Sequence, residues 1–305
     1  MPPPPIVLAV AIIGISFAAP LVRLSHAHPL AIAVWRLFFS LVVIGAILSV
    51  DRGWQQWRRL DRRGLALALA AGVMLAFHFW SWNASVGMTT VAASVVLVNI
   101  QPVIVAVASS LWLREVPSRA QWLGIALAML GAFVVAWQDY GAGARATTNR
   151  ALLGDALALF GGIAAATYYL VGRRLRQTLD LWPYVALVYG ACFVTLVGIA
   201  AAARIPVLHQ PPRELSIFAA LALGPMLLGH TGMNWALRYL PAYVVNLTVL
   251  GEPVGATLLA ALLPGIREVP ALLTLAGGVM VLAGILLALT RTAPNARGRT
   301  VANTV

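Results

Sequence analysis

Long apolar segments follow one another along the whole chain, with only short polar connections between them. A helix needs about 20 mainly apolar residues to cross the hydrocarbon core of a bilayer. The segments therefore predict an all-α integral membrane protein with ten transmembrane helices and no separate soluble domain. The ten expected spans are 5–22, 29–50, 64–87, 90–113, 120–138, 151–172, 181–203, 215–238, 242–264 and 269–290.

The composition supports a membrane protein and excludes other classes. Of the 305 residues, 61% are hydrophobic and 10% are charged, whereas a soluble domain carries roughly a quarter charged residues. The net charge of +12 would suggest nucleic acid in a soluble protein. Here the arginines lie in connections between apolar segments, so the expected partner is the lipid bilayer and no nucleic acid.

The arginines also predict the orientation of the chain. With the N-terminus inside, the inner connections and tail hold 14 arginines and the outer connections hold 6, while Arg36 lies within a span. Arginine and lysine concentrate on the cytoplasmic side of membrane proteins. We therefore expect both termini to be cytoplasmic.

An internal repeat divides the chain. LREVPSRAQWLGIALAMLGAFVV matches GIREVPALLTLAGGVMVLAGILL, with the sequence REVP at 114–117 and again at 267–270. The repeat predicts a first five-helix half over 1–140, a second over 151–291 and a cytoplasmic tail over 292–305. An odd number of spans per half inverts the second half, which is the architecture of many secondary transporters. The matched pairs are Glu115 and Glu268, Gly124 and Gly277, Gly131 and Gly284, Asn83 and Asn234, Gln101-Pro102 and Glu252-Pro253.

The order of short motifs resembles the drug/metabolite transporter superfamily, EamA type. The motifs are PLAIAVWR at 29–36, Gly154-Asp155 in the sixth span, GRRL at 172–175, GEP at 251–253 and RE at 267–268. The resemblance implies a bacterial inner-membrane exporter of amino acids or related metabolites, working by alternating access through a cavity between the halves. The most similar branch comprises the YddG-like aromatic amino acid exporters.

Glu252 lies in the apolar stretch LTVLGEPVGATLL, about ten residues into its span and so roughly 15 Å deep. A charged side chain at the bilayer centre costs at least about 2.5 kcal/mol, so such residues usually serve function. We interpret Glu252 as a proton-coupling or substrate-binding residue. A structural alternative, a hydrogen-bonded clamp, stays open because glutamine occupies the matched position in the first half.

Further candidate substrate-binding residues are polar or aromatic side chains inside the spans. The stretch FHFWSWNAS places His78 and Trp82 on one helical face, and His230 and Asn234 share a face in the eighth span. Pro102 and Pro253 are candidate hinges, because proline bends a helix and frees a carbonyl. The remaining candidates are Asn83, Asn99, Gln101 and Tyr168. Arg36 either snorkels outward, pairs with a substrate carboxylate or is structural.

Other function classes are less well supported. The chain has no P-loop, which excludes an ATP-driven pump. An intramembrane enzyme is a remote alternative, because no motif combines a nucleophile with a base or forms a metal cluster. We expect no cofactor and no metal. An exporter of cationic drugs or of another small metabolite on the same fold remains the main alternative.

Overall fold

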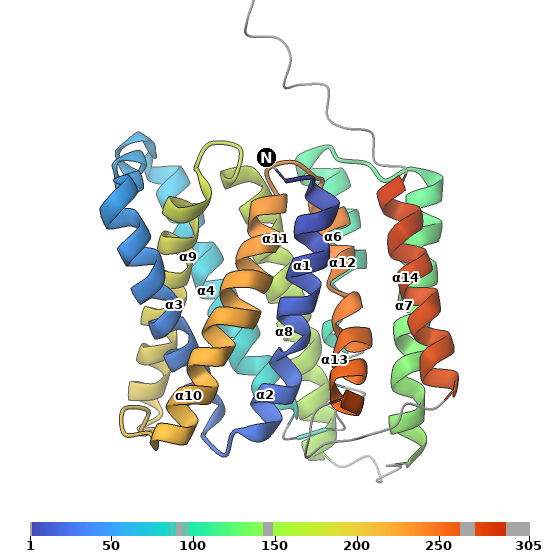
Figure 1. The fold of residues 1–305 in the computed structure, drawn as a ribbon. Coiled ribbons are helices and arrows are strands. Elements are labelled where there is room, and N and C mark those ends of the chain that lie inside the picture. Colours follow the sequence, from blue (N-terminus) through green and yellow to red (C-terminus); the bar gives the residue numbers. More distant parts are fainter. Residues whose placement is uncertain are drawn as a thin grey trace, which may run out of the picture.

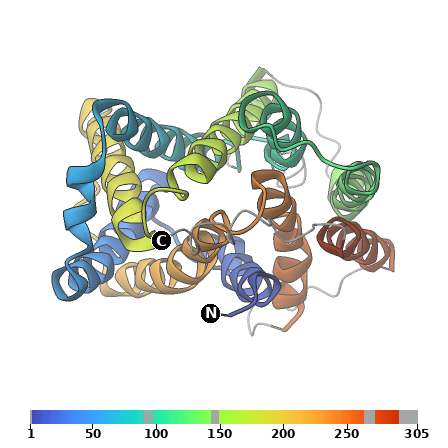
Figure 2. The same cartoon turned by 90° about the horizontal axis from the view of Figure 1, so that it is seen from above.

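The computed structural model describes residues 2–86, 88–89, 94, 97–142, 149–262 and 272–290. Within these ranges every regular element is a helix, as the apolar segments predict. The second REVP sequence and the tail lie outside the described residues. Figure 1 shows the helices standing side by side, and Figure 2 shows the same arrangement from above.

The first half contains helices of very different length. Proline opens α1 and α3, where its missing N–H group leaves no bond unmade. The elements are α1 (Pro4–Ser16), α2 (Ala18–Leu24), α3 (Pro29–Asp51), the 3-10 helix η1 (Gly53–Arg59), α4 (Arg62–Val86), α6 (Gln101–Ala108), the π-helix η2 (Ser109–Leu113) and α7 (Arg119–Ala142).

The second half also contains helices of very different length. Its eighth expected span is one continuous path made of an α-helix, a π-helix and another α-helix. The elements are α8 (Asn149–Leu175), α9 (Leu181–Ala202), α10 (Pro212–Leu221), the π-helix η3 (Ala222–His230), α11 (Thr231–Ala236), α12 (Ala242–Thr248), α13 (Gly251–Leu262) and α14 (Leu272–Thr290).

Seven helices in the described ranges are long and apolar enough to cross a membrane. The other three expected spans coincide with shorter apolar stretches: α6 with η2, the Arg119–Val134 part of α7, and α12 with α13. Two of these are interrupted at equivalent places, because a turn at residues 99–100 precedes Gln101-Pro102 and a turn at 249–250 precedes Gly251. The two candidate hinge prolines thus lie in the first turn of α6 and of α13, directly after these turns.

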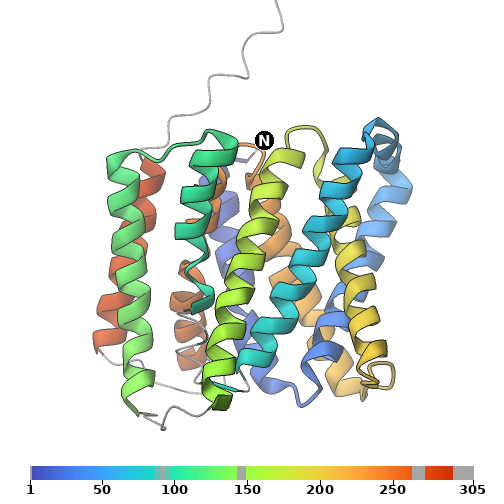
Figure 3. The same ribbon diagram turned by 180° about the vertical axis from the view of Figure 1, so that it is seen from behind.

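Two layers of contacts organise the helices. On one side, α4 packs against α8 and α9; on the other side, α1 packs against η3, α11 and α13. Figure 3 shows α8, α4 and α9 as neighbouring helices from behind. The core between these layers is apolar and includes Leu37, Leu75, Val188, Met233 and Val245.

The helices α7 and α14 form a pair at one edge of the molecule (Figure 1). Glycines allow them to approach closely: a Cβ atom on Gly131 would lie 2.6 Å from the carbonyl oxygen of Gly277, and one on Gly124 would lie 2.7 Å from that of Gly284. The contacts are crossed, because Gly124 matches Gly277 in the repeat yet packs on Gly284. Small residues serve helix packing in membranes in this way.

Candidate functional site

A group of charged, polar and aromatic side chains lies in the interior between the two layers. Arg36 of α3 is only 2% exposed, and its Cζ lies 4.2 Å from the ring centroid of Phe79 on α4. The Arg36 Nη2 group donates to the sulfur of Met226 at 3.4 Å. We call Arg36, Phe79, Tyr189, Met226, His230 and Glu252 the central cluster.

The π-helix η3 positions two members of the central cluster. Pro225 lies inside it and cannot donate a backbone hydrogen bond. A wider π turn accommodates such a break, and π-helices often occur at functional sites. Met226 and His230 lie four residues apart along η3, and the His230 ring meets Phe79 edge-on with centroids 5.5 Å apart. The Nδ1 atom of His230 is buried without a hydrogen-bond partner.

A second polar group adjoins His230 one helical turn further on. The Asn234 Nδ2 group donates to the hydroxyl of Tyr168, to the carbonyl of His230 at 2.8 Å and to the hydroxyl of Tyr189 at 3.4 Å. The hydroxyl of Tyr189 also bonds that of Thr231 at 3.1 Å. These bonds join α8, α9 and α11, but the Asn234 Oδ1 atom has no partner.

Glu252 lies in the first turn of α13, directly after the break in the ninth expected span. Its backbone N–H donates to the carbonyl of Val249 at 2.8 Å. The side chain is partly exposed and lies within electrostatic range of Arg36 and of Tyr169. Glu252 and Arg36 form no direct ion pair within 4.0 Å, although each lies within electrostatic range of the other.

The remaining candidate residues take two arrangements. His78 adjoins the central cluster, because its ring contacts Phe79 and stacks on Trp82, and its Nδ1 atom bonds the carbonyl of Gly161 at 3.0 Å. Asn83 lies apart, donating to the carbonyl of Pro29 at 3.4 Å.

Gln101 and Asn99 also lie away from the central cluster, around the start of α6. The Oε1 atom of Gln101 accepts from Asn246 of α12 at 3.3 Å, so Gln101 connects the two halves. Asn99 is buried in the turn before α6. The glutamine therefore has the clamp geometry that was the structural alternative for its repeat mate.

Sequence reasoning left Phe79 and Met226 of the central cluster out of the site. These two residues carry no signal of their own in the sequence, since aromatic and methionine side chains are common in apolar helices. Arg36 did carry one, because an arginine in the middle of a span is expensive. Its burial excludes outward snorkelling as its arrangement.

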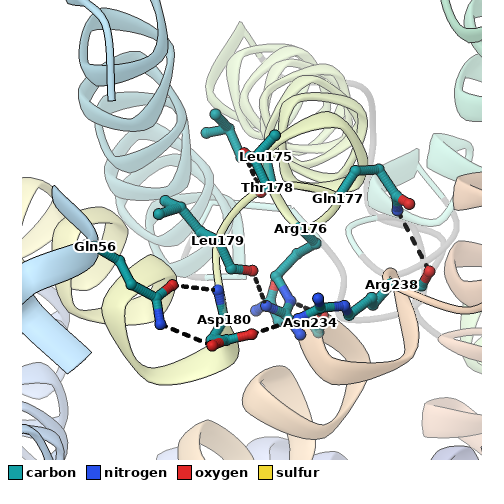
Figure 4. Close-up of polar contacts among 9 residues, drawn as sticks. All are labelled: Gln56, Leu175, Arg176, Gln177, Thr178, Leu179, Asp180, Asn234 and Arg238. Carbon is teal, nitrogen blue, oxygen red and sulfur yellow. Dashed lines mark hydrogen bonds and ion pairs between the residues drawn. The ribbon is translucent and has the colours of Figure 1, made fainter. Parts of the chain in front are cut away.

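Polar contacts tie the two halves together at the face that holds the N-terminus (Figure 4). Arg238 forms an ion pair with Asp180 at 2.5 Å, and Gln56 Nε2 donates to the same carboxyl at 2.7 Å. Hydrogen bonds from Arg238 and Gln56 hold the pKa of Asp180 below its ordinary value. We call Gln56, Glu115, Arg173, Asp180 and Arg238 the face network.

Glu115 and Arg173 form the less exposed part of the face network. The Nε group of Arg173 donates to Glu115 at 2.7 Å, and the backbone N–H of Ala242 donates to the same carboxylate at 3.1 Å. Arg173 Nη1 also donates to the carbonyl of Leu237 at 2.6 Å. Beside it, Arg176 donates to the carbonyls of Asn234 and Leu179, so these bonds tie together the ends of α8 and α11.

A protein-family comparison decides the class of this molecule. The model of the EamA-like transporter family matches residues 5–137 and again residues 152–290. The chain belongs to the EamA-like transporter family. The "Uncharacterized transporter YdfC" of Bacillus subtilis (strain 168) is 26% identical over 255 residues, which cover 81% of this chain and 78% of that one.

The fold has a solved counterpart. A structure titled "Crystal structure of protein" superposes with a TM-score of 0.75 at 16% identity, covering 93% of this chain and 96% of that one. The match to the family model makes this protein a multi-pass membrane transporter of a small molecule and not an enzyme. Among the described residues, no three His, Cys, Asp or Glu side chains gather as a metal site.

Proposed function

We propose that this EamA-like protein exports amino acids, neutral or aromatic, across the bacterial inner membrane. The observation that carries the proposal is the central cluster: a buried arginine, an acid, a histidine and aromatic rings between the two layers of helices. A small organic substrate needs apolar and aromatic walls with a few placed polar groups. Unpartnered polar atoms on Arg36, His230 and Asn234 support a site that a substrate or water completes.

Ten spans in two inverted halves are part of the proposal. The crossed glycine contacts of α7 and α14 support it, since a two-fold rotation exchanges matched residues and reproduces the same contacts. The matching breaks before Gln101-Pro102 and Glu252-Pro253 support it as well. Broken helices at the midplane commonly form the substrate sites of secondary transporters.

Alternating access is the mechanism that we propose. The face network lies at the end of the molecule where arginine-rich connections gather, including η1 and the α8–α9 turn. The positive-inside tendency supports a cytoplasmic position for this end, and with it cytoplasmic termini. On this reading the structure is closed toward the cytoplasm, and export requires the face network to break and re-form in each cycle.

Glu252 is our candidate for proton coupling, and His78, Trp82, Asn83, Asn99, Gln101, Tyr168, His230 and Asn234 are proposed to line the substrate path. Pro102 and Pro253 are proposed hinges. An exporter of cationic drugs is the second candidate, favoured by the acid beside aromatic rings, but the buried Arg36 repels a cation.

Uptake of labelled amino acids into liposomes containing the purified protein tests the proposal. Aromatic amino acids should accumulate, and an imposed pH gradient should speed uptake if Glu252 couples protons. An uptake rate that does not change with the pH gradient would indicate facilitated diffusion without proton coupling. Absence of transport for every amino acid would overturn the substrate assignment and leave membership of the family intact.

A further inference from the structure

Arg36 is a buried cation with few partners. A guanidinium carries five N–H donors, yet Arg36 makes one weak hydrogen bond, to the sulfur of Met226, and its Nε group makes none. The guanidinium also lies over the face of the Phe79 ring. A buried charge is costly unless it is paired, so this site favours an anion, and none of the described side chains forms an ion pair with Arg36.

Glu252 provides an opposite charge that does not reach Arg36. The two side chains interact electrostatically but form no ion pair within 4.0 Å. Glu252 starts α13 after a break in its span, while Arg36 lies within α3, so each is held by its own helix. An arginine and an acid that do not pair with each other can together bind a ligand that carries both an anion and a cation.

Building on the amino-acid assignment above, we propose that Arg36 and Glu252 bind the two charged ends of a zwitterionic α-amino acid. The guanidinium of Arg36 donates paired hydrogen bonds to the substrate carboxylate. The carboxyl oxygens of Glu252 accept from the substrate ammonium. Phe79, His230 and Tyr189 lie around Arg36 and contact the remainder of the substrate.

The small number of hydrogen-bond partners of Arg36 supports a ligand-binding role over a structural ion pair with Glu252. A structural pair would bring Arg36 and Glu252 into contact and satisfy the guanidinium, as Glu115 does for Arg173 at 2.7 Å. The structure thus contains an arginine that is paired with a glutamate at its face and a buried arginine, Arg36, that has no ion pair. An unpaired buried guanidinium has the properties of a binding site for an anionic group.

End-group analogues test the proposal in liposomes. The probes are labelled phenylalanine and leucine, competed by their amides, which lack the carboxylate, and by 3-phenylpropionate and 4-methylpentanoate, which lack the ammonium. We expect each amino acid to compete at least about tenfold better than either analogue. Equal competition by all three would overturn this proposal, while the uptake itself would still support amino-acid transport.

Variants assign each end group to its residue. With Arg36→Met, the amino acid and its amide should compete equally, and Arg36→Lys should restore part of the difference. With Glu252→Gln, the amino acid and its des-amino analogue should compete equally. Because each comparison is a ratio within one variant, a general loss of folding cancels; a wild-type ratio in Arg36→Met would overturn the proposal.

Glu214→Gln is the matched control. Glu214 is also a buried acid, but it bonds Ser25 and the backbone N–H of His26 at the opposite face. Its removal should leave the end-group ratios at wild-type values. Failure of the wild-type protein to transport either amino acid would overturn both this proposal and the amino-acid assignment, a result distinct from transport without discrimination.

Discussion

The buried arginines of this protein differ in how many hydrogen-bond partners they have. Arg173 and Arg176 each donate to carbonyl or carboxylate oxygens, whereas Arg36 has one sulfur partner. Burial of an unpaired polar group costs free energy. Substitution of a buried residue that carries an unpaired polar group, such as Arg36, should therefore have a large effect on transport and a small effect on folding.

Glu252→Gln should impair transport far more than stability. The substitution keeps the size of the side chain but removes its negative charge, which lies within electrostatic range of Arg36, and replaces one acceptor oxygen by an N–H donor group. We expect uptake to fall at least about tenfold, which corresponds to about 1.4 kcal/mol, with little change in the thermal midpoint in detergent. Wild-type uptake by a well-expressed Glu252→Gln protein would remove any chemical role for this residue.

At the scale of the helices, close approach depends on glycine. Gly131→Ala would place a Cβ atom 2.6 Å from the carbonyl oxygen of Gly277, so α7 and α14 must separate. We expect a loss of about 1–3 kcal/mol, as for other overpacked sites, measured as a lower thermal midpoint of the purified protein.

Gly45→Ala and Gly198→Ala are the controls for this substitution. Both glycines are helical, in α3 and α9, and an added Cβ atom would meet nothing within 4 Å. Because glycine costs about 0.5–1 kcal/mol relative to alanine inside a helix, these two changes should stabilise the protein. A lower midpoint for all three variants would show that packing of α7 on α14 is not the cause.

The sequence predicted elements better than contacts. The length of the apolar segments predicts the helices, and the positions of Pro102 and Pro253 predict the breaks. The repeated glycines predict the close contact between α7 and α14. Each of these signals acts locally or through one pair of matched positions. The central cluster could not, because Arg36 and Met226 are separated by 190 positions and meet only through tertiary packing. Nor does any local signal predict that the span around Pro225 forms a π-helix.

Across the whole molecule, the face network should make stability depend on pH. The folded pKa of Asp180 is lowered, chiefly by the hydrogen bond from Arg238, while an unfolded aspartate titrates near about 3.9. The ionised form is therefore favoured by folding, so the stabilisation is present above the unfolded pKa and is lost as pH falls through the folded one.

Asp180→Asn measures this contribution. Because the ion pair is exposed, the substitution should cost at most about 1 kcal/mol at neutral pH, seen as a lower thermal midpoint in detergent. The gap between wild type and variant should stay constant down to about pH 4 and then close. A gap that persists at much lower pH would contradict the role of the Asp180 charge.

The chain contains a single cysteine, Cys192 of α9, which is fully buried and lies within electrostatic range of Arg36. Any thiol reagent that labels the folded protein must therefore penetrate to the neighbourhood of the central cluster. The native protein carries its own single-site reporter, with no background thiols to remove. The labelling rate of Cys192 measures how often the interior becomes accessible to water. A reagent that cannot cross the membrane shows from which side the interior opens.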